Sequence, residues 1–322
     1  MPPTPAPPVI WLLSDSRPGH QSQLRGLGER LEARLWARIH TIEAGHYPLS
    51  LWQTLIGRMP LPTAPLPSLL LAAGHGSHRL LLALRRRLRV PGVVLMTPSF
   101  PLSWVDGAII PAHDRPRQSE RVLTVQGVLN KARPVTRLSP HHRGLVLLGG
   151  PSRHYHWDNT SLAGQIRQLC RLYPHWQWTL ASSRRTPRPL MAALEDQPAL
   201  TRVAAEDTDP DWLLQQLRDS RAVWVTPDSV SMISEALTSA LPTGLLALAP
   251  KGRSRVARGV QAMADQGLLP VWPDHQAVMA GQAPGPALQE ADRAALWLAQ
   301  RFFPQHPVRD TDGRPAENPD AS

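Results

Sequence analysis

The sequence predicts an α/β protein of two Rossmann-like domains, each with a parallel sheet covered by helices. Short apolar runs alternate with amphipathic helical patterns, as expected for parallel strands joined by crossover helices. The alternation stops over residues 133–143, which contain two prolines, two histidines and no apolar periodicity, and then starts again. A chain of 322 residues is also long enough for two domains of ordinary size.

The first domain is expected over residues 9–135. Leucines spaced three or four residues apart predict a helix at about 20–36, and a second helix is predicted from residue 77 to about 88. Residues 1–8 are rich in proline and are expected to be disordered. Strands are predicted at 9–13, 39–42, 69–73, 93–97, 108–110 and 122–125.

The second domain is expected over residues 144–303, after the linker at 133–143. Residues 304–322 are polar and are expected to form a disordered tail. Strands are predicted at 144–148, 176–181, 222–225 and 245–248. Helices are predicted at about 158–172, 229–239, 255–266 and 286–301, the last two closing this domain.

Composition narrows the classes of partner. The net charge of +10 is carried almost entirely by arginine, which favours nucleotides, anionic lipids or nucleic acid. Nucleic acid is not favoured, because the sequence lacks the aromatic and basic motifs of known binding modules. The single cysteine, Cys170, excludes an internal disulfide and a cysteine-based metal site. Neither a metal site nor a cofactor is predicted.

Location follows from the apolar segments. Val9–Leu13 is too short for a signal peptide or a membrane span, so a cytoplasmic protein is expected, at most peripheral to a membrane. The segment Leu49–Arg58 has two interpretations. Trp52, Leu55 and Ile56 share a helical face with Leu49, and that face either contacts a membrane, with Arg58 near the headgroups, or faces the core.

Polar segments follow three predicted strands of the second domain, where open parallel sheets bind their ligands. The most informative begins at Thr226 and ends at Ala236. Asp228 or Ser229 is a suitable N-cap, and Ser229 and Ser231 lie in the first helical turn, where backbone N–H groups attract a phosphate. The alternative is a capped helix with no further role.

The second polar segment is the loop at 182–187. Arg184 and Arg185 are adjacent and are flanked by Ser183 and Thr186, a combination suited to a diphosphate. An exposed basic loop is the alternative.

The third segment is a glycine pair, Gly149 and Gly150, which lets backbone approach a ligand closely but is a weak signal alone.

The first domain supplies candidate general bases in loops that follow its strands. They are Asp15 and His20, in the loop after the first strand, and His113 and Asp114, after a later one. Each histidine taken alone could equally be a bystander.

These segments together resemble the mitochondrial fission Elm family, named for a plant protein and common in bacteria. The resemblance covers about residues 9–270. The sequence departs from the family at Ser16 and His75, where glycine and arginine are usual, and at residues 240–243. It rests on WLLSDSRPGHQSQ from Trp11, residues 71–77, PAHD from Pro111, GGPSRHY from Gly149, SSRRTP from Ser182 and VTPDSVSMISEA from Val225.

The resemblance implies a glycosyltransferase-B-like fold with a nucleotide cleft between its domains. On that scaffold Glu235 would accept both ribose hydroxyls of a bound nucleotide. The implied activity is transfer of a sugar from a nucleotide-sugar donor to an acceptor such as a cell-envelope glycan or lipid. It needs no metal, since a helix dipole and basic side chains offset the charge of the diphosphate. A non-catalytic binding or scaffold protein is the alternative.

Overall fold

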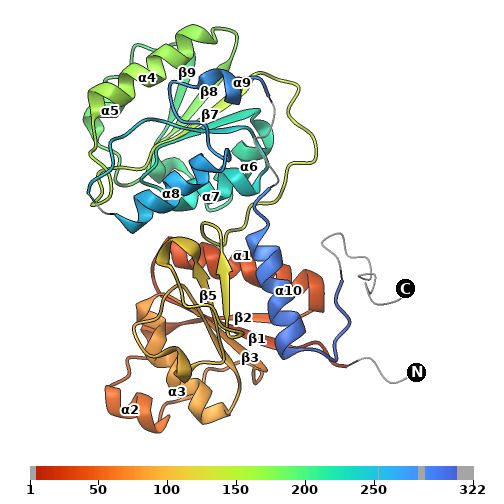
Figure 1. The fold of residues 1–322 in the computed structure, drawn as a ribbon. Coiled ribbons are helices and arrows are strands. Elements are labelled where there is room, and N and C mark those ends of the chain that lie inside the picture. Colours follow the sequence, from red (N-terminus) through yellow and green to blue (C-terminus); the bar gives the residue numbers. More distant parts are fainter. Residues whose placement is uncertain (1–4, 253, 282–286, 310–322) are drawn as a thin grey trace. The chain divides into compact units, whose positions relative to one another are not determined.

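The structure, a computed structural model, describes residues 5–252, 254–281 and 287–309. The chain forms two compact units. Unit 1 combines the chain up to Lys131 with the segment from Gln289 onward, and unit 2 spans Ala132–Leu288 (Figure 1). The predicted α/β class with two parallel sheets is confirmed.

The sheet of unit 1 has the order β2-β1-β3-β4-β5-β6, with every neighbouring pair parallel. Helices α1 and α10 pack on one face of this sheet and α3 on the other, so β1, β3, β4 and β5 are almost entirely buried. Burial on both faces explains their continuous apolar sequences. The strands are β1 (Val9–Ser14), β2 (Arg38–Glu43), β3 (Leu69–Ala73), β4 (Gly92–Leu95), β5 (Gly107–Pro111) and β6 (Val122–Val125). The helices are α1 (Pro18–Leu35), α2 (Leu51–Ile56), α3 (His78–Leu88) and α10 (Glu290–Phe302), with short 3-10 turns η1 (Ala44–His46), η2 (His75–Ser77), η3 (Leu102–Trp104) and η4 (Ala112–Asp114).

Unit 2 repeats the design with the strand order β11-β10-β7-β8-β9, again all parallel. Its sheet separates two apolar clusters, one formed with α4 and α5 and the other with α7 and α8. The strands are β7 (Arg143–Leu147), β8 (Gln177–Ala181), β9 (Leu200–Val203), β10 (Ala222–Val225) and β11 (Thr243–Leu245). The helices are α4 (Asn159–Leu172), α5 (Arg188–Ala192), α6 (Trp212–Asp219), α7 (Val230–Thr238), α8 (Arg255–Asp265) and α9 (His275–Met279), with the 3-10 turn η5 (Ala205–Asp207).

The predicted second domain, 144–303, was wrong at its C-terminal end, because α10 belongs to unit 1. Arg30 of α1 is fully buried, and its Nε lies 3.2 Å from Oδ2 of Asp292 on α10. Apolar residues such as Leu31 and Leu298 fill the interface between the two helices. A buried arginine needs a carboxylate partner, and α10 supplies it.

The linker and the tails also differ from the prediction. Ala132 is buried in the core of unit 2, and the N–H of Val135 donates to the carbonyl of Ser239, so the region expected as a linker, 133–143, starts inside unit 2. Pro8 accepts a hydrogen bond from Arg38, and Arg309 stacks on the ring of Trp36, so both flanks contact unit 1 through at least these residues. The remaining predicted disorder, at 1–4 and 310–322, lies outside the described residues.

The helix α2 does not face the core. Thr54 is its only buried residue, although Leu49 just before it is also buried. The core-facing interpretation of this segment is therefore wrong for the helix itself. Within the residues that the structure describes, no helix is long and apolar enough to cross a membrane.

Candidate functional site

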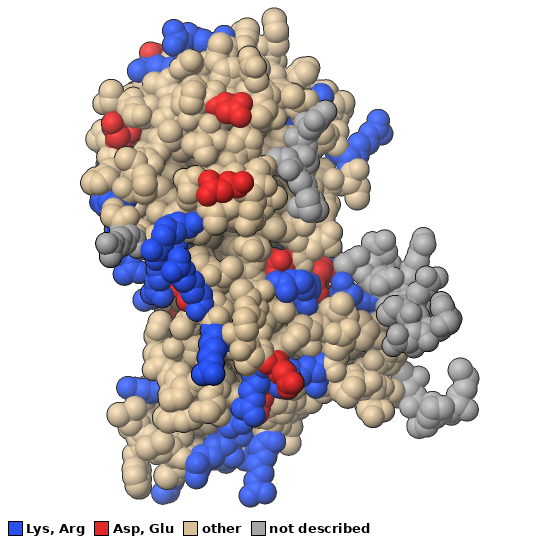
Figure 2. Space-filling model, in the orientation of Figure 1, with Lys and Arg blue, Asp and Glu red and all other residues tan. Residues whose placement is uncertain are grey.

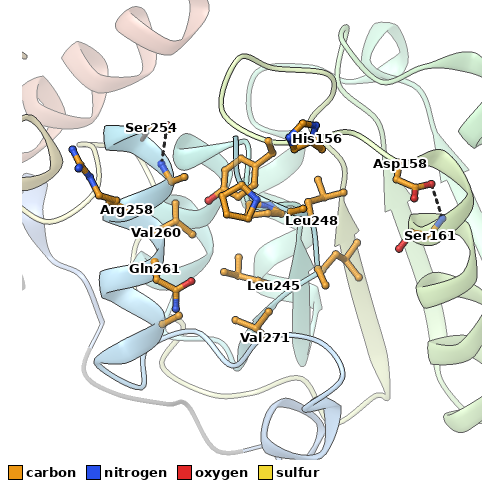
Figure 3. A pocket seen from close by; sticks show the side chains of 18 of the residues that line it. His156, Asp158, Ser161, Leu245, Leu248, Ser254, Arg258, Val260, Gln261 and Val271 are labelled. Carbon is orange, nitrogen blue, oxygen red and sulfur yellow. Dashed lines mark hydrogen bonds between the residues drawn. The ribbon is translucent and has the colours of Figure 1, made fainter. Parts of the chain in front are cut away.

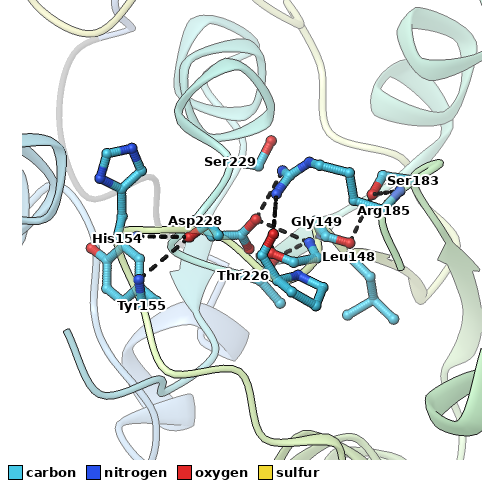
Figure 4. Close-up of polar contacts among 12 residues, drawn as sticks. Leu148, Gly149, His154, Tyr155, Ser183, Arg185, Thr226, Asp228 and Ser229 are labelled. Atoms are coloured by element: carbon cyan, nitrogen blue, oxygen red, sulfur yellow. Dashed lines mark hydrogen bonds and ion pairs between the residues drawn. The ribbon is translucent and has the colours of Figure 1, made fainter. Parts of the chain in front are cut away.

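Three loops at the carboxyl edge of the unit 2 sheet are connected to one another by hydrogen bonds. The N–H of Gly149, after β7, donates to Oγ1 of Thr226, after β10, at 2.8 Å. The N–H of Gly150 donates to Oδ2 of Asp228 at 3.0 Å. The Asp228 side chain is fully buried, and its Oδ1 has no hydrogen-bond partner within the described part of the chain. Figure 4 shows the loops converging on this carboxylate.

Arg185 holds the same loops together from the β8 side. Its Nη2 donates to Oδ2 of Asp228 at 2.9 Å, and its Nη1 donates to the carbonyl of Gly150 at 3.0 Å (Figure 4). Arg184, in contrast, is exposed and makes no hydrogen bond or ion pair with the described residues. The two adjacent arginines therefore differ: the guanidinium of Arg185 is bound to the neighbouring loops, whereas that of Arg184 is exposed and can contact a ligand.

Two hydroxyl groups of the loop after β8 also connect it to the loop after β7. Oγ of Ser183 and Oγ1 of Thr186 donate to the same carbonyl, that of Gly149, at 2.7 Å and 2.6 Å. The glycine pair is required by these contacts, since a Cβ on Gly149 would lie 2.3 Å from Oδ2 of Asp228 and one on Gly150 would lie 2.2 Å from the carbonyl oxygen of Arg185. The close approach that the glycines permit is thus to the chain's own neighbouring loops.

The helix α7 starts directly behind these loops. Ser229 is its N-cap residue, one of the two predicted, but its side chain makes no capping hydrogen bond. Its hydroxyl is buried and lies 3.5 Å from that of Ser231, which is exposed. The N–H groups of the first turn are therefore not satisfied by the N-cap side chain, and an uncapped helix start with a positive dipole end favours an anion.

Glu235 lies further along α7 and is partly exposed. No hydrogen bond or ion pair to its carboxylate is found among the described residues. Burial raises the pKa of Glu235 to about 7. The charged form of Glu235 therefore lacks a hydrogen-bond donor that would offset its burial among these residues, and a donor from a bound ligand would stabilise it.

A pocket of about 650 Å³ opens beside these loops, at the end of β11 (Figure 3). It meets the fastened loops through Pro227, which stands between Thr226 and Asp228. Apolar residues of β11, of the loop that follows it and of α8 line this pocket, together with polar residues of α8 and of the segment before α4. The residues that line it include Tyr155, His156, Asp158, Ser161, Leu245, Leu248, Ser254, Arg258, Val260, Gln261 and Val271.

None of the predicted nucleotide-binding residues lines this pocket, and its position was not predicted from the sequence. The run GGPSRHY contains Tyr155, and this run was a usable signal. Burial, together with the negative charge of Asp228, raises the pKa of Tyr155 to about 12, so its phenol stays protonated at neutral pH.

Unit 1 brings two of its four predicted bases together. Nδ1 of His20 lies 2.8 Å and 2.9 Å from the two carboxylate oxygens of Asp15. Asp15 follows β1 and His20 lies in the first turn of α1, so one strand-to-helix connection builds the pair. Gly74 makes room for it: a Cβ there would lie 2.2 Å from both Oδ2 of Asp15 and Nδ1 of His20.

The other two predicted bases are not part of this pair. His113 and Asp114 form η4 after β5, and β3 and β4 lie between β5 and β1 in the sheet. Asp114 accepts a hydrogen bond from Thr97 at 2.9 Å.

His78 is a neighbour of the Asp15–His20 pair that the prediction did not include. Burial and the nearby His75 lower the pKa of His78 to about 4, so it stays neutral at pH 7. The described residues contain no group of three or more His, Cys, Asp or Glu side chains that could hold a metal ion.

Two all-parallel sheets with polar loops at their carboxyl edges define the glycosyltransferase-B class of fold, and solved structures agree. A putative UDP-N-acetylglucosamine 2-epimerase from Listeria monocytogenes matches with a TM-score of 0.57 and 14% identity, over 97% of this chain and 99% of that one. The Neisseria meningitidis UDP-GlcNAc 2-epimerase bound to UDP-GlcNAc matches with a TM-score of 0.54 and 11% identity, over 91% of this chain and 100% of that one. MurG from Acinetobacter baumannii matches with a TM-score of 0.53 and 10% identity, over 91% of this chain and 100% of that one.

The chain belongs to the mitochondrial fission ELM1 family, whose sequence model matches residues 18–302. A relative is the uncharacterized protein RP120 of Rickettsia prowazekii (strain Madrid E), 21% identical over 294 residues, which are 72% of this chain and 81% of that protein. The predicted family and the predicted glycosyltransferase-B-like fold are both confirmed.

Proposed function

We propose that this protein is an enzyme that transfers a sugar from a nucleotide-activated donor, with unit 2 as the donor-binding unit. The observation that carries the proposal is the uncapped start of α7 behind loops that Thr226, Asp228 and Arg185 fasten to one another. Such a frame presents backbone N–H groups in fixed positions, which suits the diphosphate of a donor.

The side chains around this frame supply the remaining contacts of the proposed donor site. The exposed guanidinium of Arg184 shares a loop with Arg185 and would pair with the diphosphate. The pocket beside Pro227 has a volume suited to a nucleoside and combines apolar with polar lining residues. Glu235 would accept the ribose hydroxyls. A relative of similar fold is bound to UDP-GlcNAc, so this compound is the first donor to test.

The Asp15–His20 pair would supply the base. Because Nδ1 of His20 faces a carboxylate, the proton of the neutral ring belongs on Nδ1, and the lone pair on Nε2 is available. Nε2 would take the proton of an acceptor hydroxyl while its oxygen bonds to the anomeric carbon and the nucleoside diphosphate leaves. Asp15 would stabilise the imidazolium that forms.

The test is thermal unfolding of the full chain with nucleoside diphosphates and UDP-GlcNAc. A ligand that binds only the folded state raises the melting temperature. We expect nucleotides with one particular nucleobase to raise the melting temperature selectively. The variant His20→Ala should keep that stabilisation while losing the transfer of sugar. If no nucleotide stabilises the protein, the proposed enzyme is wrong, and a non-catalytic binding or scaffold role on the same fold becomes the better account.

A further inference from the structure

The surface of α2 and the loop that follows it is unusually apolar. Trp52 is 70% exposed, Leu51 is 67% exposed and Leu55 is 53% exposed. Six of the ten large apolar side chains that are exposed in the described structure lie within residues 51–66. We call this cluster the α2 patch; its members are Leu51, Trp52, Leu55, Ile56, Leu61 and Leu66.

The fold holds the α2 patch outward. Ser50 and Gln53 form a capping box at the start of α2, and Gly57 ends the helix in a left-handed conformation with φ of 70°. The helix packs on α3 close to Gly57, where an added Cβ would lie 3.3 Å from the carbonyl oxygen of Ala83. Nη1 of Arg79 donates to the carbonyl of Leu49 at 3.0 Å and fixes the approach to the helix. The exposed apolar face is therefore a property of an anchored helix.

The sequence around the patch is rich in arginine. The sequence between Glu43 and Asp106 contains six arginines and no acidic residue. Arg58, Arg86 and Arg89 are exposed and make no ion pair with the described residues. Figure 2 shows Lys and Arg side chains gathered over the end of unit 1 that carries α2 and α3 in Figure 1.

We propose that the α2 patch docks on the surface of an anionic phospholipid bilayer. Exposed tryptophan and leucine side chains enter the boundary between headgroups and acyl chains, while the surrounding arginines contact lipid phosphates. The charge selects this occupant: an apolar protein partner would not require the excess of arginine near the patch, whereas an anionic membrane attracts the exposed Arg58, Arg86 and Arg89. The proposal does not rest on the donor site of unit 2.

The test is flotation of the full chain with vesicles of phosphatidylcholine alone or mixed with phosphatidylglycerol. We expect binding to the mixed vesicles at low salt, weakened at high salt by screening. The double variant Trp52→Ser, Leu55→Ser should weaken binding roughly tenfold or more through lost insertion. The triple variant Arg58→Glu, Arg86→Glu, Arg89→Glu should weaken it roughly a hundredfold.

A matched control carries the same kind of change elsewhere. Trp104 and Leu172 are 47% and 45% exposed, and replacing both with Ser should leave flotation unchanged. Sedimentation velocity distinguishes a second copy of the chain as the occupant. If the wild type does not float, or if the α2 double variant turns a dimer into a monomer without affecting flotation, the membrane proposal is overturned.

Discussion

Arg185 and Asp228 form an ion pair of unequal exposure: Nη2 of an arginine side chain that is 46% exposed lies 2.9 Å from Oδ2 of a carboxylate that is fully buried. The adjacent Arg184 has no ion-pair partner among the described residues. Two neighbouring residues of one type thus have different surroundings, and their variants should separate stability from ligand binding.

The first prediction concerns this arginine pair. Arg185→Ala leaves the buried Asp228 carboxylate with the N–H of Gly150 as its donor, and should lower the free energy of unfolding by about 1–3 kcal/mol. Arg184→Ala should change it by less than about 0.5 kcal/mol, yet weaken nucleoside diphosphate binding by about 1.5–3 kcal/mol. Urea unfolding and calorimetry measure the two effects. Equal destabilisation by both variants would contradict the assignment.

The second prediction concerns Gly74. Gly74→Ala places a methyl group against Asp15 and His20 at a backbone φ of 85°, which side chains rarely adopt. It should destabilise unit 1 by about 1–3 kcal/mol and abolish any transfer activity, because the pair must separate. Gly164, inside α4, has nothing within 4 Å of a Cβ, so Gly164→Ala should instead stabilise by about 0.5–1 kcal/mol. Thermal unfolding of both variants compares them.

The third prediction concerns the pH dependence of stability. The pKa of Glu235 rises from 4.5 to about 7 in the folded state, so folding favours its neutral form. This contribution is complete below pH 4.5 and is lost as the pH rises to 7. The shift corresponds to roughly 3 kcal/mol, an upper bound because the side chain is partly exposed. Glu235→Gln should remove the loss, so its stability relative to wild type should increase between pH 4.5 and pH 7. A constant difference over this range would rule out a raised pKa.

A fourth prediction tests the ribose contact at the same residue. Ribonucleotide affinity should rise as the pH increases through about 7, because the Glu235 carboxylate accepts the hydroxyl groups better than the acid does. Glu235→Gln should weaken ribonucleotide binding by about 1.5–3 kcal/mol and affect the matching deoxynucleotide much less. Equal losses for both nucleotides would identify Glu235 as a residue of helix packing instead.

A fifth prediction tests the packing of α10 on α1. Asp292→Ala leaves the fully buried Arg30 without its nearest carboxylate and should destabilise unit 1 by about 3–5 kcal/mol. Asp196 pairs with Arg167 at 3.4 Å on the surface, and Asp196→Ala should leave the free energy of unfolding almost unchanged. Denaturant unfolding of both variants is the measurement. A mild effect of Asp292→Ala would show that the ion pair adds little to the helix interface.

The strands buried on both faces were predictable because each is a nearly continuous apolar run, as in β3 and β10. The edge strand β9 was not, since Leu200–Val203 alternates only weakly and is buried mainly at Leu200. The helix α10 itself was predicted, but helical periodicity does not say which sheet an apolar face covers. The contact from Arg30 to Asp292 spans 262 residues and leaves no local signal.

The candidate site divides in the same way. The loops were predictable because polar segments directly follow strands, and the Asp15–His20 pair lies within one such loop. The different environments of Arg184 and Arg185 were not, because they depend on a carboxylate 43 residues beyond Arg185. The pocket at the end of β11 combines residues from 155 to 271, so its lining emerges only when the sheet forms.

The return of α10 to unit 1 has a consequence for synthesis on the ribosome. Unit 2 is one uninterrupted stretch and can complete its core once Leu288 has emerged. Unit 1, although translated first, lacks one helix of its core until Phe302 is made, and Arg30 lacks its partner until then. The later half of the protein can therefore mature before the earlier half, which makes nascent unit 1 the part most exposed to chaperones.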